Sequence, residues 1–253
     1  MRAKRFMAAL TVLSLLPALC ACAQNKAALR KEAEATRDLA EAYMGEGKYR
    51  LALRQLKKAE TLNPEDSIVQ NDLGLVYLAL EDPQQAVEHF ERALELNPEY
   101  NAVLNNLGAA YLAMRQWDKA EEVFTRLNHD LMYASPHLPL HNLGYVHYQK
   151  GNYAKAIEYY KRALEFAPEF SQSYRGMGRA YMAMRQYQQA IRALEKAVEL
   201  APQFAEAYLD LAEAYGAAGR RGEALKALNT VIRMLPQSAL ADRARTLRME
   251  MGL

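Results

Sequence analysis

The stretch LGLVYLALEDPQQAVEHFERALELNPEYNAVLNNLG, residues 73–108, begins and ends on Leu-Gly and decides the fold. It contains Leu-Gly-x2-Tyr, a later Ala and Phe, and an Asn-Pro pair, and this pattern returns at a 34-residue period. The matches begin at Leu39, Leu73, Leu107, Leu143, Met177 and Leu211, with two extra residues before the fourth. Recurrence at a nearly constant spacing predicts a protein built from one repeated supersecondary unit.

The residue types within each unit predict two antiparallel helices. Small residues such as Gly74 and Ala86 let the helices approach closely, and Tyr77 fills the remaining space between them. Glycine costs about 1 kcal/mol relative to alanine inside a helix, so its recurrence indicates a packing requirement. Pro98 ends the second helix, because proline has no backbone N–H and disfavours helix in the residue before it. The unit resembles the tetratricopeptide repeat.

This resemblance implies an all-α fold, a right-handed α-solenoid in which each unit buries its apolar face against its neighbours. Phased on the closing proline, the six units are 33–66, 67–100, 101–134, 137–170, 171–204 and 205–238. Residues 239–253 are predicted to form a capping helix, because the last unit needs a cover with a polar outer face.

Composition and motifs argue against catalysis and against nucleic-acid binding. The 253 residues carry a net charge of +2, with 51% apolar and 25% charged side chains, which is ordinary for a folded protein. The Gly176-Met-Gly178 pair lies inside a repeat helix with no strand before it, so it does not predict a phosphate loop. We expect no enzyme activity, no cofactor and no small-molecule substrate.

The N-terminus predicts export and lipid attachment. Residues 1–21 combine a basic start with an uncharged stretch over 6–19, which is too short to span a bilayer but typical of a signal peptide. Leu19-Cys20-Ala21 before Cys22 resembles the bacterial lipobox, so Cys22 is the predicted lipidation site. The alternative is an ordinary cleaved signal with two incidental cysteines. If Cys22 is lipidated, residues 22–32 are the lipidated N-terminus and a short tether, helical from about Lys26.

Cleavage before Cys22 would change the charge and the thiol chemistry of the chain. Removal of three basic residues leaves 29 basic and 30 acidic side chains. The sulfur of the one remaining cysteine would carry lipid, which excludes a disulfide within the mature chain.

A break in the repeat pattern points to a narrower family. After Leu127 the expected proline is missing, and Leu131-Met132-Tyr133 leads to Ser135-Pro136 and Asn142-Leu143-Gly144. With the lipobox, the six units and the third-unit opening at residues 101–108, this junction resembles the type IV pilus biogenesis lipoproteins of the PilF, PilW and Tgl group.

The family resemblance implies a pilotin, an outer-membrane lipoprotein facing the periplasm that helps the pilus secretin reach that membrane and multimerise. The partner would be the secretin, and the membrane contact would be made by the lipid. Ala23, which is not aspartate, is consistent with outer-membrane sorting in the enterobacterial pattern. The alternatives are an envelope scaffold for peptidoglycan hydrolases or another complex and, against the signal peptide, a cytoplasmic co-chaperone.

A partner is predicted to bind along the concave face, formed by the second, fifth, ninth and twelfth positions of each first helix. The predicted groove residues are Asn71, Leu75, Leu78, Asn105, Leu112, His141, Tyr145, Tyr148, Arg175 and Arg179. The apolar and aromatic members would take an amphipathic helix, and the two asparagines would grip a peptide backbone. The arginines, one helical turn apart, could meet a carboxylate or an acidic stretch. Alternatively, Leu75 and Leu112 only complete the packing between repeats.

The histidines predict packing more than metal binding. His137 and His141 are four residues apart, as zinc ligands on one helix face are, but no cysteine or H-E-x-x-H motif accompanies them. His147 occupies a position that is tyrosine in other units, which predicts a packing substitution.

Lipidation gives a direct test. Cys22→Ala should abolish labelling of the protein by a radioactive or clickable fatty acid in growing cells, because the thioether-forming sulfur is gone. Cys20→Ala, the matched control, should still be labelled. Continued labelling of the Cys22→Ala variant would contradict the anchor.

Overall fold

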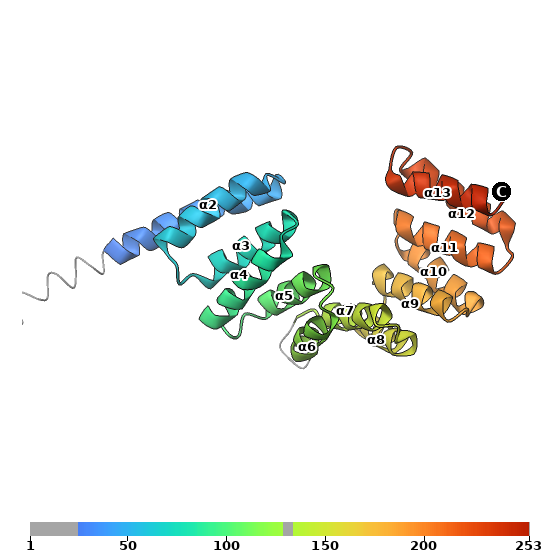
Figure 1. Ribbon diagram of the computed structural model, residues 1–253, viewed down its shortest axis with the longest axis horizontal. Coiled ribbons are helices and arrows are strands. Elements are labelled where there is room, and N and C mark those ends of the chain that lie inside the picture. The colour runs from blue at the N-terminus through green and yellow to red at the C-terminus, as the bar shows by residue number, and fades with distance from the viewer. Residues whose placement is uncertain (1–24, 129–133, 253) are drawn as a thin grey trace, which may run out of the picture. The chain divides into compact units, whose positions relative to one another are not determined.

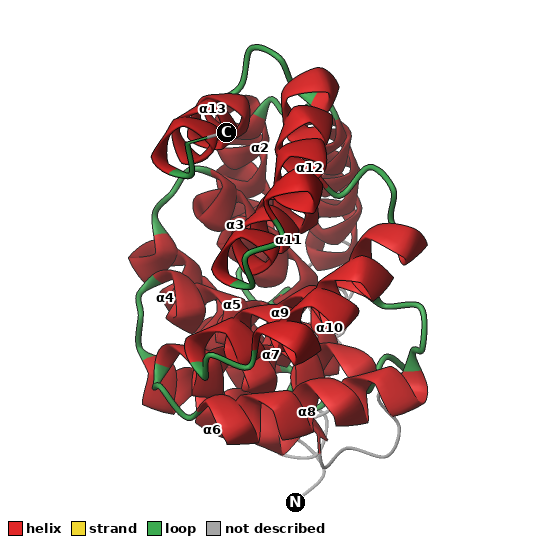
Figure 2. Ribbon diagram, turned by 90° about the vertical axis from the view of Figure 1, so that its right-hand side faces the viewer, coloured by secondary structure: helices red, strands yellow, loops and turns green. Residues whose placement is uncertain are grey.

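The computed structural model describes residues 25–128 and 134–252. The predicted signal peptide, Cys22 and the Leu131-Met132-Tyr133 stretch lie outside these residues. The described part of the chain consists of α-helices and short connections, with no strand (Figure 2). This confirms the all-α prediction.

The helices follow one another along the chain in pairs (Figure 1). Their bounds are 25–45, α2 (Tyr49–Leu62), α3 (Ser67–Ala79), α4 (Pro83–Leu96), α5 (Asn101–Ala113), α6 (Trp117–Asn128), α7 (His137–Gln149), α8 (Tyr153–Phe166), α9 (Ser171–Ala183), α10 (Tyr187–Leu200), α11 (Ala205–Ala217), α12 (Arg221–Met234) and α13 (Ala239–Glu250). The first helix begins at residue 25 and continues into the first repeat, so residues 25–32 extend the first helix of that repeat.

Local sequence explains where helices begin. The Asp66 carboxylate accepts hydrogen bonds from the backbone N–H groups of Ile68 and Val69, which caps α3. Asp82 caps α4 in the same way, and Pro83 occupies the first helical position, where its missing N–H costs nothing.

The turns between the two helices of a pair share one backbone conformation. A residue with positive φ recurs in each of them, at Gly47, Glu81, Arg115, Gly151, Arg185 and Gly219. Glycine fills three of these positions, as the left-handed region favours.

The chain divides into two compact units, residues 1–114 and 115–253. Within the first, α3 packs on α2, α4 and α5; within the second, each helix from α6 to α13 packs on its neighbour in sequence. The boundary falls in the third repeat, so α5 belongs to the first unit and α6 to the second.

Helix pairs are held together where a small residue on one helix faces a large one on the other. A Cβ atom added to Gly74 would lie 2.4 Å from the ring of Phe90, and one added to Gly178 would lie 2.4 Å from Leu194 Cγ. Gly144 meets Tyr160 in the same way, at 2.7 Å. These contacts confirm that the recurring glycines serve close helix packing.

The last helix covers the final repeat. Ala241, Ala244 and Leu247 of α13 are buried, and Met251 lies against Gly216. The outer face carries arginines whose partners are within the chain, such as Arg243, which lies 3.5 Å from Glu213. None of the described helices combines the length and the apolar character that a bilayer-spanning segment needs.

The helix contact at Gly74 predicts a stability change. Gly74→Ala should lower the free energy of unfolding by about 1–3 kcal/mol, because Phe90 is fully buried and its rigid ring must move. Gly45→Ala is the matched control in the same unit, with nothing within 4 Å of the added methyl group. Denaturant unfolding followed by circular dichroism measures both, and a Gly74→Ala variant as stable as the control would contradict the contact.

Candidate protein-binding site

The predicted groove residues of the first compact unit, residues 1–114, have different environments. Leu75, Leu78 and Leu112 are half-buried, as is Asn105, and their part in a groove stays a prediction. Asn71 differs from the prediction, since only 6% of its surface is exposed.

The amide of Asn71 is engaged within the chain. Its Oδ1 accepts a hydrogen bond from Nδ2 of Asn106 in the next repeat at 3.0 Å, and its Nδ2 donates to Asp72 at 3.2 Å. The side chain therefore links two repeats, and its burial leaves little of the amide open to a peptide backbone. This observation argues against the groove role predicted for Asn71.

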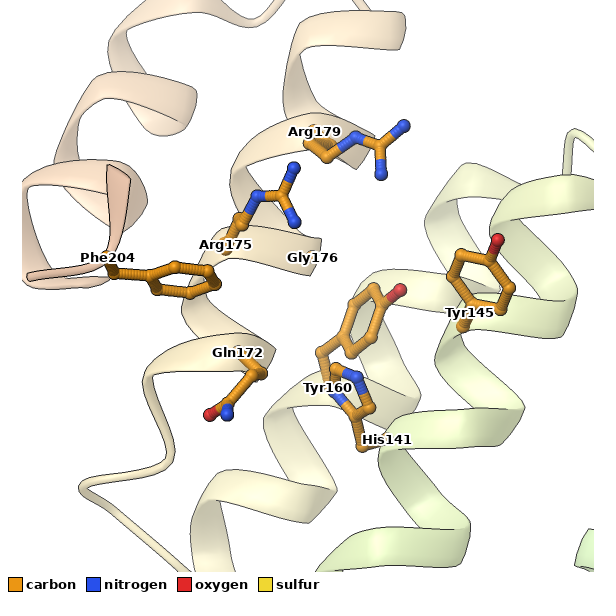
Figure 3. Close-up of a pocket in the computed structure, with 8 residues that line it drawn as sticks. All are labelled: His141, Tyr145, Tyr160, Gln172, Arg175, Gly176, Arg179 and Phe204. Atoms are coloured by element: carbon orange, nitrogen blue, oxygen red, sulfur yellow. The ribbon is translucent and has the colours of Figure 1, made fainter. Parts of the chain in front are cut away.

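The predicted groove residues of the second compact unit, residues 115–253, lie close to one another. His141 and Tyr145 of α7 and Arg175 and Arg179 of α9 line one cavity of about 180 Å³ (Figure 3). Tyr148 lies beside it, with the Arg179 guanidinium 4.8 Å from its ring centroid. Two separate helices thus bring together five residues that were predicted independently in two repeats.

Four further residues complete the cavity wall and were not predicted. They are Tyr160 of α8, Gln172 and Gly176 of α9, and Phe204, which precedes α11. A signal for two of them was present in the sequence. Tyr160 is the one hydroxyl-bearing residue in the series Leu56, Phe90, Phe124, Tyr160, Leu194 and Leu228. Gly176 stands where the other units have Asp38, Asp72, Asn106, Asn142 and Asp210.

The two arginines differ in their charge balance. Arg175 Nε donates to Asp210 Oδ2 at 2.6 Å, and its guanidinium lies 5.4 Å from the Phe204 ring centroid. Burial raises the pKa of Asp210, an effect that the nearby Arg175 opposes. Arg179 makes no ion pair within the described residues, and its guanidinium contacts the ring and the hydroxyl of Tyr148. The cavity therefore has one matched and one unmatched cation.

His141 adds no charge at neutral pH. Burial, together with the neighbouring His137, lowers the pKa of its imidazole to about 4. Its Nδ1 lies 3.0 Å from the Ser173 hydroxyl oxygen, and its ring lies 5.3 Å from that of Tyr160. The positive charge of the cavity thus comes from guanidinium groups.

The other histidines near the site have packing roles. His137 and His141 both meet the Phe170 ring edge-on, at centroid distances of 5.0 and 5.2 Å. His147 is 2% exposed and stacks on Tyr159, which accounts for its position in the repeat pattern. The described ranges contain no group of three side chains placed to hold a metal ion.

Paired helices in tandem define an α-helical repeat protein. In this one, an aromatic and cationic cavity lies between two successive pairs. The chain belongs to the tetratricopeptide repeat family. Models described as tetratricopeptide repeat match residues 31–99, residues 77–131 together with 181–247, and residues 139–170. Proteins of this family bind protein partners through a fold that is generally non-enzymatic.

Solved structures with the same fold include two pilus proteins. PilW, described as a widely conserved type IV pilus biogenesis factor, is 22% identical with a TM-score of 0.76; the match covers 83% of this chain and 97% of PilW. PilF of Pseudomonas aeruginosa is 21% identical with a TM-score of 0.71, covering 87% of this chain and 99% of PilF.

A third solved structure of the same fold is YrrB, described as a tetratricopeptide repeat protein with an unusual peptide-binding site. It is 21% identical with a TM-score of 0.52, covering 76% of this chain and 97% of YrrB. A search of the curated proteins finds no match. At these identities the likeness shows the fold.

The pKa of His141 predicts a pH effect on stability. A histidine in an unfolded chain has a pKa of about 6.5. Between about pH 4 and pH 6.5 the unfolded state therefore binds more protons than the folded state, and the free energy of unfolding falls as the pH falls. His141→Asn introduces the residue type that the second and third repeats have at the equivalent positions, Asn71 and Asn105. The substitution should remove about 1–3 kcal/mol of that loss.

Urea unfolding of both proteins at several pH values between 4.5 and 7.5 measures the difference. The unfolding free energies of the wild type and of His141→Asn should diverge as the pH falls. Parallel curves would contradict a neutral, buried imidazole.

Proposed function

We propose that this chain is an outer-membrane lipoprotein, facing the periplasm, that acts as a pilotin for the secretin of a type IV pilus. Lipid on Cys22 holds the repeats at the membrane. The repeat surface binds a segment of the secretin, which is thereby delivered to the membrane where it multimerises. The role requires binding and no turnover.

The single observation that carries this proposal is the near-complete overlap with two pilus proteins. The match takes in 97% of PilW and 99% of PilF, so the likeness extends over essentially the whole length of each. Tetratricopeptide folds are widespread, and a general likeness would carry little. PilW and PilF match 83% and 87% of this chain at TM-scores of 0.76 and 0.71, whereas YrrB, also covered to 97%, matches 76% at 0.52, and this difference supports a shared assembly role.

The N-terminal sequence supports the same location. A lipobox-like Leu-Cys-Ala stands before Cys22. It follows a leader with a basic start and an uncharged core. Each buried acyl CH₂ contributes about 0.8 kcal/mol, so two or three chains would hold the protein firmly on a bilayer. Anchoring also raises the local concentration of the binding surface near the membrane, which favours capture of a weakly bound segment.

Genetics tests the proposal. In a strain lacking this protein, detergent-resistant secretin multimers in the outer-membrane fraction and surface pili should both fall by about tenfold or more, since delivery by tethering is lost. The wild-type gene should restore both, and Cys22→Ala should not. Normal multimers together with altered cross-linking of the cell wall would contradict the pilotin role and favour a scaffold for peptidoglycan hydrolases.

The predicted groove is tested by charge insertion. Leu78→Glu plus Leu112→Glu should abolish co-purification of the secretin from envelope extracts, because a charge would replace an apolar side chain at two predicted groove positions. Helicity should be unchanged, because both side chains are only half-buried on the first helices of their repeats. The matched control is Leu235→Glu plus Met249→Glu, at two apolar residues that are 43% and 71% exposed. Unchanged secretin capture by the groove variant would contradict the groove assignment.

A further inference from the structure

The first repeat begins the described part of the chain, and one face of its first helix is open. In the second to sixth repeats, the third, seventh and tenth residues are buried, apart from the half-buried Met177. The first repeat has Ala35, Leu39 and Ala42 at these positions, and all three are exposed. The buried equivalents are Val69, Leu73, Val76, Val103, Leu107, Ala110, Pro139, Leu143, Val146, Ser173, Ala180, Ala207, Leu211 and Ala214.

The equivalent face is covered by the second helix of the preceding repeat. Leu73 of α3 packs in one cluster with residues of α2, and Leu211 of α11 packs in another with residues of α10. Both covering helices are 14 residues long and present an apolar stripe. The covering residues are Ala52, Leu56 and Ala59 in α2, and Ala190, Ile191 and Leu194 in α10. The open face therefore has the form that binds a helix of about four turns.

A tyrosine hydroxyl adds a polar requirement to this face. Tyr111 donates to Glu91 at 2.8 Å and Tyr215 donates to Glu195 at 2.6 Å, and both glutamates lie on the second helix of the preceding repeat. Each glutamate directly follows a large buried residue. Tyr43 is the equivalent residue of the first repeat, and no described residue accepts a hydrogen bond from its hydroxyl. A covering helix without an acceptor would leave that donor unsatisfied, which is unfavourable.

The described chain has no helix left to cover this face. Each second helix from α2 to α10 already packs on the first helix that follows it, and α12 packs on α13. A second copy of the chain therefore has no uncovered second helix to offer within the same ranges. Cleavage before Cys22 would leave residues 22–24 ahead of the first helix, which span about 10 Å when extended and are too few to form another.

We propose that the face formed by Ala35, Leu39, Ala42 and Tyr43 binds one amphipathic helix of a partner protein, packed as the second helix of a preceding repeat would be. The partner helix has an apolar stripe with alanine and leucine four residues apart. It also has a glutamate directly after the leucine, which accepts the hydrogen bond from Tyr43. This face shares no residue with the predicted groove, and the inference does not rest on the pilotin role.

A peptide that copies α10 is the probe. It has the sequence of residues 187–200, with a hydrocarbon staple joining the exposed positions 188 and 192 so that it stays helical. Fluorescence anisotropy of the labelled peptide, titrated with residues 22–253 carrying Cys22→Ser, should show saturable binding. Leu39→Glu should weaken this binding about tenfold or more, because the contact would bury a charge against an apolar stripe.

The matched control is Ile68→Glu in the same compact unit. Ile68 is 41% exposed and Leu39 is 45% exposed, so both variants should keep the circular dichroism spectrum of the wild type. Ile68→Glu should leave peptide binding unchanged. The groove variant Leu78→Glu plus Leu112→Glu should also bind the peptide, which separates this face from the proposed secretin site.

A double-mutant cycle tests the polar contact. Tyr43→Phe should weaken binding of the α10 peptide about fivefold to tenfold, since a hydrogen bond to a charged acceptor is lost. A second peptide, with alanine in place of Glu195, should bind the wild type and Tyr43→Phe equally well, because the two changes remove the same contact. Equal weakening of both peptides by Tyr43→Phe would contradict the hydroxyl–glutamate contact.

Three other results would overturn the inference. The first is a stapled peptide that does not bind, or that binds Leu39→Glu as well as the wild type. The second is a dimer in light scattering that Leu39→Glu abolishes, which would assign the face to a second copy. The third is flotation of the unlipidated protein with phosphatidylethanolamine and phosphatidylglycerol vesicles that Leu39→Glu abolishes, which would assign the face to the bilayer.

Discussion

The structure depends on close contact between the two helices of each pair, where a small residue on one helix meets a large one on the other. A Cβ on Gly74, Gly144 or Gly178 would lie within 2.7 Å of Phe90, Tyr160 or Leu194. Because each repeat is stabilised mainly by its own pair and its immediate neighbours, this contact must recur in every unit. The 34-residue period follows from that requirement, since any change in helix length would move the small residue away from the large one.

Much of the fold could be predicted because these contacts are local. Helix pairing, the closing prolines and the capping role of α13 depend on residues within one repeat or on its next neighbour. The partner of Asn71 could not be predicted in the same way. Its hydrogen bond to Asn106 depends on how the first helices of two repeats align, which the spacing of residues does not specify. Asn71 therefore carried a polar side chain at a predicted groove position yet proved to be buried.

The candidate site was predicted in part for a related reason. Tyr145, Arg175 and Arg179 lie on first helices at positions expected to be open, and they do line one cavity. Tyr160 lies on a second helix, at a position that faces the core in every other repeat, so its type suggested packing alone. Its hydroxyl reaches the cavity only because Gly176 leaves room beside it, and that relation joins two residues from different repeats.

A cavity formed in this way ties ligand binding to the stacking of repeats. Its lining comes from α7, α8 and α9, with Phe204 before α11, so a bound group contacts two successive repeats, the fourth and the fifth, at once. In a linear array of repeats, stability is approximately the sum of the units and their interfaces, and a ligand that touches both sides of an interface strengthens that interface. At this interface the polar contact runs from His141 to the Ser173 hydroxyl, 3.0 Å away. Arg175, which lines the cavity, also donates to Asp210 of the sixth repeat, so a group bound beside it would bear on the next interface as well.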